Sequence, residues 1–236
     1  EAIEELYEGM KIACGEYKVD LVGGDTTSSL KGLIVTITVV GHAKKEEIVY
    51  RHTAQNKDII CVTGDLGAAY VGLQVLRQEK EVFLANPEMQ PELTEKNYVV
   101  ERQLKPEARM DLVLDLKDLG IVPTSMIDIS DGLASELLHI CTKSNLGATI
   151  FEDKLPIGSE TLNTMASLNL SSTACVLNGG EDYELLFTIK QSDFDKIKNH
   201  QDISTIGYMN EKEKGINLIS NGGKSVPVEA QGWVHF

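Results

Sequence analysis

Three short stretches of the chain combine glycines with carboxylates at points where apolar segments end. They are GGDTT at 23–27, DISDGL at 128–133 and GGEDYEL at 179–185. Glycine backbone lets a phosphate group approach closely, and carboxylate oxygens are good ligands for Mg2+. Each stretch alone is equally typical of an ordinary turn in which an aspartate bonds its own backbone. Their joint presence indicates one site that binds phosphate and metal.

The DISDGL stretch carries the most specific chemistry of the three. Asp128 and Asp131 lie where a predicted strand ends and a predicted helix begins, so both carboxylates can reach one Mg2+ ion. We expect Ser130 or Asp131 to cap that helix, whose N-terminus favours anions. The alternative interpretation is a simple helix cap beside a solvated aspartate.

The elements that must position these residues follow from apolar periodicity. The pattern predicts helices at 1–17, 108–119, 131–143 and 193–199, and strands at 19–22, 33–42, 57–63, 124–129, 148–151, 185–189 and 204–209. A strand, a glycine turn (TGDLGAA, 63–69) and a helix form the basic unit of an α/β fold. That turn lacks the Lys-Ser/Thr ending of a phosphate-binding P-loop, so we interpret it as close packing of strand against helix. We predict an α/β fold with mixed α+β sheets.

Bulk composition excludes several classes of partner. Lys and Arg number 22 against 36 Asp and Glu, a net charge of −14, which argues against nucleic-acid binding. An acidic protein can still bind a phosphate ligand when Mg2+ ions lie between the like charges. No apolar run is long enough to span a membrane, and the four scattered cysteines favour reduced thiols in the cytoplasm.

The three stretches, in this order and followed by a terminal GWVHF, resemble the thiamine-monophosphate kinases. These enzymes belong to the superfamily of aminoimidazole ribonucleotide synthetase and selenophosphate synthetase. The resemblance implies a fold in which 1–52 are the C-terminal part of an N-terminal ATP-binding and dimerisation domain, and 53–236 are a C-terminal α/β domain. The chain begins within a helical pattern, EAIEELYEGM, so we expect that an N-terminal portion with further acidic ligands is missing from it.

The reaction implied by the resemblance is transfer of the γ-phosphoryl group of ATP to thiamine monophosphate, which gives thiamine diphosphate. Several Mg2+ ions assist, with Asp25, Asp128 and Asp131 as implied metal ligands and Asp25 and Asp131 as catalytic residues. A cytoplasmic homodimer is implied for the full-length enzyme.

The resemblance also implies contacts to both substrates. Tyr7, Gly24, Asp25, Arg51 and Ser130 match ATP-contacting positions, although Tyr7 fits a helix core equally well and Arg51 could be an exposed charge at a strand end.

One acidic position and one aromatic position match contacts to the thiamine moiety. Glu181 matches an acid on that side, and Trp233 matches an aromatic residue able to stack on the cationic ring. Trp233 could instead close a core, and Asp182 and Glu184 are near enough in sequence to share the role of Glu181.

Two alternatives remain open at this point. The chain could be another ATP-dependent enzyme of the same superfamily that acts on a different small molecule. It could also be a truncated, inactive binding domain, although three aspartates retained at such turns favour turnover.

Overall fold

The computed structural model describes residues 2–91 and 93–230, and the chain divides into two compact units at 1–46 and 47–236. In the described residues no helix is both long and apolar enough to cross a membrane. Trp233, a predicted substrate contact, lies outside the described residues.

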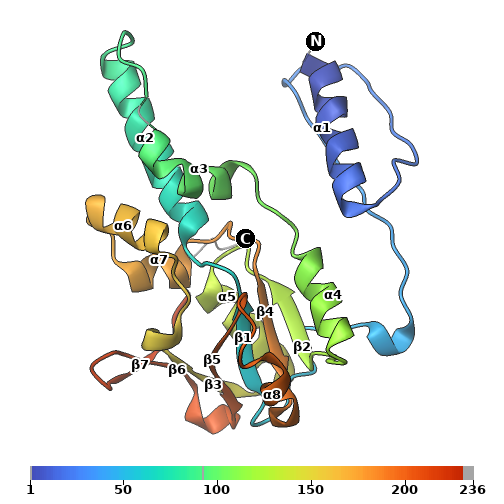
Figure 1. Ribbon diagram of the computed structural model, residues 1–236, viewed down its shortest axis with the longest axis vertical. Coiled ribbons are helices and arrows are strands. Elements are labelled where there is room, and N and C mark those ends of the chain that lie inside the picture. Colours follow the sequence, from blue (N-terminus) through green and yellow to red (C-terminus); the bar gives the residue numbers. More distant parts are fainter. Residues whose placement is uncertain (1, 92, 231–236) are drawn as a thin grey trace. The chain divides into compact units, whose positions relative to one another are not determined.

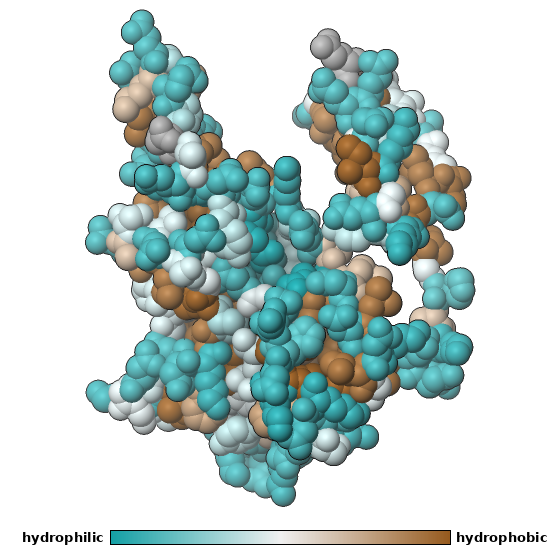
Figure 2. All heavy atoms as spheres, viewed as in Figure 1, coloured by the Kyte–Doolittle hydropathy of each residue, from teal (hydrophilic) through white to brown (hydrophobic). Residues whose placement is uncertain are grey.

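The first unit contains helix α1 (Ala2–Tyr17), followed by irregular chain as far as the short 3-10 turn Lys45–Glu47 (Figure 1). The strands predicted at 19–22 and 33–42 are wrong, because the described residues of those segments form no strand. Their apolar side chains are exposed, with Val40 at 88% of its full accessibility, and apolar atoms are visible on this unit in Figure 2. A β-branched segment becomes a strand only when a neighbouring strand accepts its hydrogen bonds, and the described part of this unit supplies none.

The second unit is built on one mixed sheet whose described strands follow the order β2-β4-β1-β5-β3-β6-β7 (Figure 1). The strands are β1 (Ile59–Thr63), β2 (Ser125–Asp128), β3 (Gly147–Phe151), β4 (Leu185–Ile189), β5 (Ile203–Asn210), β6 (Ile216–Ile219) and β7 (Ser225–Pro227). The β3–β6 pair is parallel and the other pairs are antiparallel. The predicted mixed α/β fold is confirmed.

Helices cover both faces of this sheet. They are α2 (Ala68–Ala85), α3 (Asn97–Leu104), α4 (Met110–Asp118), α5 (Leu133–Ser144), α6 (Ser159–Ser167), α7 (Ser172–Asn178) and α8 (Phe194–Ile197). Short 3-10 turns lie at Thr94–Lys96, Glu152–Lys154, Gln191–Asp193 and Lys212–Lys214. Strand β1 alternates between the two faces: Ile60 and Val62 pack against α5, whereas Cys61 packs against α4 and α8. Burial on both faces explains why β1 reads as a continuous apolar run.

Helices α2 and α3 form a third packed cluster with α6 and α7. Gly72 of α2 allows the close approach of α3, because a Cβ atom there would collide with the backbone carbonyl of Val99. Helix α3 also carries Arg102, whose side chain reaches the loop before β4.

Candidate active site

The turn between β2 and α5 places Asp128, Ser130 and Asp131 at one end of the sheet. Asp128 is the last residue of β2 and is exposed, while Ser130 and Asp131 are partly buried. The prediction that Ser130 or Asp131 caps α5 is wrong, since the N-cap is Gly132 (φ 112°) and no side chain in the described part of the chain bonds the cap. A Cβ atom at Gly132 would lie 2.7 Å from the carbonyl oxygen of Leu177, so the contact between this turn and α7 requires glycine.

Glu136 lies in the first helical turn of α5, and its side chain stabilises the DISDGL turn that precedes the helix. Its Oε1 accepts a hydrogen bond from the backbone N–H of Asp131 at 3.1 Å and lies 3.4 Å from the Ser130 hydroxyl. The side chain is buried, and Oε2 has no hydrogen-bond partner among the described residues. Burial raises the pKa of Glu136 to about 7, and the negative charges of Asp131 and Asp128 add to the rise. The sequence analysis missed this residue, although an acid in the first helical turn after DISDGL was a usable signal.

The GGEDYEL stretch runs beside the DISDGL turn and extends the β2–β4 pairing. The N–H of Glu181 donates to the carbonyl of Ser130 at 2.7 Å, and the N–H of Tyr183 donates to the carbonyl of Ile129 at 2.9 Å. The N–H of Ile129 in turn donates to the carbonyl of Glu184 at 2.7 Å. Two stretches far apart in sequence therefore form one backbone unit, as the joint pattern had indicated.

Side chains of this loop alternate between two sides. Glu181 (φ 63°) and Tyr183 (φ 51°) both adopt left-handed backbone, which costs free energy for residues other than glycine. Their side chains lie on the accessible side, where the Tyr183 hydroxyl donates to Glu181 Oε2 at 3.2 Å. Burial raises the pKa of Tyr183, as do the negative charges of Glu181, Asp128 and Asp131. These four residues therefore share one acidic site.

Asp182 and Glu184 point the opposite way, into the protein, with 1% and 2% of their surfaces exposed. The Asp182 carboxylate accepts the N–H groups of Gly67 and Ala69 at 2.7 and 3.2 Å, at the N-terminus of α2. The TGDLGAA turn thus binds an anion, and that anion is the protein's own Asp182 carboxylate. Burial raises the pKa of Asp182 to about 7, while the two N–H donors and the nearby Arg102 oppose the rise.

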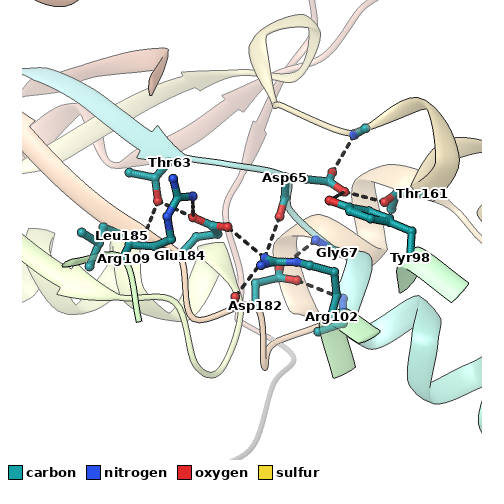
Figure 3. Close-up of polar contacts among 12 residues, drawn as sticks. Thr63, Asp65, Gly67, Tyr98, Arg102, Arg109, Thr161, Asp182, Glu184 and Leu185 are labelled. Carbon is teal, nitrogen blue, oxygen red and sulfur yellow. Dashed lines mark hydrogen bonds and ion pairs between the residues drawn. The ribbon is translucent and has the colours of Figure 1, made fainter. Parts of the chain in front are cut away.

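Glu184 is the acceptor at the centre of a buried ionic network (Figure 3). Arg102 Nη2 donates to Oε1 at 2.9 Å, Arg109 Nη1 donates to Oε2 at 2.6 Å, and the Thr63 hydroxyl donates to Oε2 at 2.5 Å. A cavity of about 550 Å3 borders this network and is also lined by Tyr98 and Lys105. Glu184 and Asp182, left open as ligand-facing acids, are instead structural partners of the loop. Arg102 carries no motif that could have revealed its contacts from the sequence.

The predicted residues of the first unit also lie close to one another. The Tyr7 hydroxyl is 3.4 Å from the Thr26 hydroxyl, and a Cβ atom at Gly24 would lie 3.9 Å from the Tyr7 hydroxyl. Asp25 Oδ1 accepts the N–H of Thr26 at 2.9 Å, a local turn bond that leaves its other oxygen available.

Arg51 lies in an exposed turn of the second unit and makes no hydrogen bond or ion pair within residues 2–91 and 93–230. Its guanidinium group is therefore available to a ligand.

Magnesium was predicted at Asp25, Asp128 and Asp131. Within the described chain, no three side chains of the His, Cys, Asp and Glu types converge closely enough to hold a metal ion by themselves. Asp128 and Asp131 nevertheless fit a Mg2+ ion, since neither carboxylate has a cationic partner among the described residues and both raise the pKa of Glu136. Mg2+ commonly takes one or two carboxylates and completes its coordination with water and substrate phosphate.

Comparison with known proteins first defines a class. Residues 1–43 match the family model of the AIR synthase related protein N-terminal domain, and 58–216 match that of the C-terminal domain. The chain is thus an AIR synthase related protein.

Individual relatives narrow this class. The chain is 35% identical over 240 residues to thiamine-monophosphate kinase of Bacillus subtilis, covering 99% of the chain and 70% of that protein. Identity to the kinase of Aquifex aeolicus is 32%, with coverage of 99% and 69%. The solved structure of AaThiL complexed with AMPPCP and TMP superimposes with a TM-score of 0.77 at 29% identity, over 99% of this chain and 68% of that one. The chain belongs to the thiamine-monophosphate kinase family.

Proposed function

We propose that this chain transfers the γ-phosphoryl group of ATP to the phosphate of thiamine monophosphate, forming thiamine diphosphate and ADP. The observation that supports the proposal is the backbone hydrogen bond from Glu181 to Ser130, which joins the loop expected to contact thiamine to the turn expected to bind ATP and metal. Family membership supplies the substrates, and the relative complexed with AMPPCP and TMP is consistent with them.

Phosphoryl transfer depends on positioning and charge neutralisation more than on covalent chemistry. Asp128 and Asp131 would hold Mg2+ on this unit and Asp25 on the other, and the ions would neutralise charge on both phosphate groups. Glu136 accepts the backbone N–H of Asp131 and lies 3.4 Å from the hydroxyl of Ser130, so the main chain that carries the expected metal and ATP side chains is held in place before ligands bind.

The remaining side chains receive binding roles. Tyr7, Gly24 and Arg51 contact ATP, with Arg51 pairing with phosphate oxygens through its guanidinium group. Glu181 and Trp233 contact the thiamine moiety, where a carboxylate and an indole both favour the cationic ring.

Formation of thiamine diphosphate from thiamine monophosphate, ATP and Mg2+ tests the proposal. Wild type should turn over, and Asp131→Ala should lose activity by about 100-fold or more, because a metal-assisted step loses several kcal/mol of stabilisation. Asp153→Ala, at an exposed acid outside the site, is the matched control and should keep wild-type activity. A folded wild type that phosphorylates another small molecule instead would move the assignment to a sister enzyme of the superfamily, and one with no turnover would favour a binding domain.

The organisation of the active protein is part of the same proposal. We assign residues 1–52 to an ATP-binding and dimerisation domain and 53–236 to the C-terminal α/β domain, with a homodimer as the working state. Exposed apolar side chains at Val39 and Val40 support the homodimer, because a partner strand would cover them. Free thiols at Cys61, Cys141 and Cys175 fit the reducing cytoplasm. Sedimentation of the protein at micromolar concentration tests the dimer.

A further inference from the structure

The loop that carries Glu181 and Tyr183 is held in a backbone conformation that it would not adopt alone. Two left-handed residues in a stretch of three are sparsely populated for side chains other than glycine, so surrounding contacts must specify them. Backbone bonds to Ile129 and Ser130 supply part of that constraint. They act on Glu181, Tyr183 and Glu184 and leave the carbonyl of Asp182 to another donor.

That donor is Arg102, from the last turn of α3. Its Nη2 donates to the carbonyl oxygen of Asp182 at 3.0 Å and to Glu184 Oε1 at 2.9 Å, and it lies 3.4 Å from the carbonyl oxygen of Asp65 (Figure 3). The guanidinium thus links the main-chain carbonyl of Asp182, which lies between the two left-handed residues, to the buried carboxylate of Glu184 two residues further along. The Arg102 side chain is 16% exposed, so water competes weakly for these bonds.

Arg109 provides an internal comparison. It binds the same carboxylate, Glu184, at 2.6 Å, and its other donors go to Asp111. It makes no hydrogen bond to the main chain of the loop in the described residues. Both arginines therefore form an ion pair with Glu184, but only Arg102 also donates a hydrogen bond to the main chain of the loop within the described residues.

We infer that Arg102 is a positioning residue for the thiamine side of the site, acting through the Asp182 carbonyl to hold Glu181 and Tyr183 toward the substrate. This inference rests on the proposed function, because it assigns the thiamine contact to Glu181. Within the described residues, the hydrogen bonds of Arg102 go to Asp65, Asp182 and Glu184 and none goes to Asp128, Ser130 or Asp131, so we expect its influence to be selective for thiamine monophosphate.

The test compares Arg102→Met with Arg109→Met in the same assay of thiamine diphosphate formation. Arg102→Met should raise KM for thiamine monophosphate about tenfold, the size expected for losing one charge-assisted hydrogen bond, and leave KM for ATP unchanged. Both variants should lower thermal stability to a similar extent, because Glu184 loses one partner in each. Arg109→Met should nevertheless keep KM for both substrates near wild type. An equal rise in KM for both variants would overturn the inference, since it would reflect the charge of Glu184 and not the grip on the loop.

A double-mutant cycle with Glu181→Gln separates positioning from general damage. If Arg102 acts through Glu181, the double variant should bind thiamine monophosphate no more weakly than the poorer single variant. Additive losses would overturn the inference while leaving the kinase assignment intact. A Glu181→Gln variant with wild-type affinity would overturn the inference together with the substrate contact on which it rests. If Arg102→Met fails to fold, Arg102→Met/Glu184→Gln removes the buried charge and carries the same measurements.

Discussion

A Cβ atom on Gly180 would lie 2.6 Å from the carbonyl oxygen of Ser130, which is the acceptor of the Glu181 N–H. Gly180 also has a φ of 71°, where side chains other than glycine are strained. The close contact between the DISDGL turn and the GGEDYEL loop therefore requires glycine at position 180.

We expect Gly180→Ala to lower the free energy of unfolding by about 1–3 kcal/mol and to lower activity at subsaturating thiamine monophosphate. The methyl group must push the loop away from Ser130, because backbone atoms there cannot rotate aside. Urea unfolding and initial rates check both effects. Gly222→Ala, at an open position without positive φ, should change neither, and an unaffected Gly180→Ala would contradict the close contact.

Mg2+ should change the effect of the Asp128 and Asp131 charges on stability from destabilising to stabilising. Without Mg2+, Asp128→Asn/Asp131→Asn should melt higher than wild type, because it removes like charges beside Glu136. With Mg2+ at about 100 times its dissociation constant, wild type should gain about 2.7 kcal/mol, and chelation should abolish the gain.

Melting curves of both proteins with Mg2+ and with a chelator make this comparison. A double variant that gains as much as wild type from Mg2+ would place the metal elsewhere. Asp153→Asn serves as the control for loss of an exposed acid.

Asp182 should give the protein a stability that falls as pH rises. Its folded pKa is about 7 against an ordinary value of 3.8, so its favourable contribution is complete below about pH 4 and is lost as pH rises through 7. Each unit of that shift corresponds to about 1.4 kcal/mol.

Urea unfolding of wild type and Asp182→Asn between about pH 5 and 8 measures this contribution. The variant should lack part of the decline, and the remainder should come from Glu136, whose pKa of about 7 gives the same sign. Asp153→Asn should keep the wild-type slope. Parallel slopes for wild type and Asp182→Asn would mean that the carboxylate stays charged throughout.

Gly72→Ala should separate α2 from α3, because the new methyl group meets the Val99 carbonyl. We expect a loss of about 2 kcal/mol or more, together with a weaker affinity for thiamine monophosphate, since α3 carries Arg102. Gly9→Ala, in open space on α1, is the matched helical control. Lost stability with unchanged affinity would show that α3 can shift without moving the loop.

The sequence allowed the second unit to be predicted better than the first. Strand β1 and helix α5 were predicted from their apolar patterns. Both elements pack in the cores on the faces of the sheet, so their buried positions are occupied by apolar residues. The segment 33–42 has an equally strong strand pattern and forms no strand, since pairing requires a neighbour that the pattern cannot supply.

Within the site, DISDGL and GGEDYEL were correctly expected to converge. DISDGL follows β2 and GGEDYEL precedes β4, and these two strands are antiparallel neighbours, so both stretches lie at the same end of the pair. The direction of each side chain could not be predicted. Asp182 and Glu184 look identical in kind to Glu181, and only the left-handed backbone at Glu181 and Tyr183 divides them into two sides. Arg102 and Glu136 reach the site from helices, where an isolated charge has no distinctive sequence signal.

That division has a practical consequence for redesign. The accessible positions 181 and 183 contribute little to the packed interior, so their chemistry could be exchanged to accept a different ring, provided the new residue tolerates left-handed backbone, as glycine and asparagine do. The inward positions 182 and 184 would have to change together with their partners on α2 and α3. If the proposed function holds, residues that contact the ligand alternate along this loop with residues that pair inside the protein. A library that varies only positions 181 and 183 would test new substrates while it leaves the internal pairs of Asp182 and Glu184 intact.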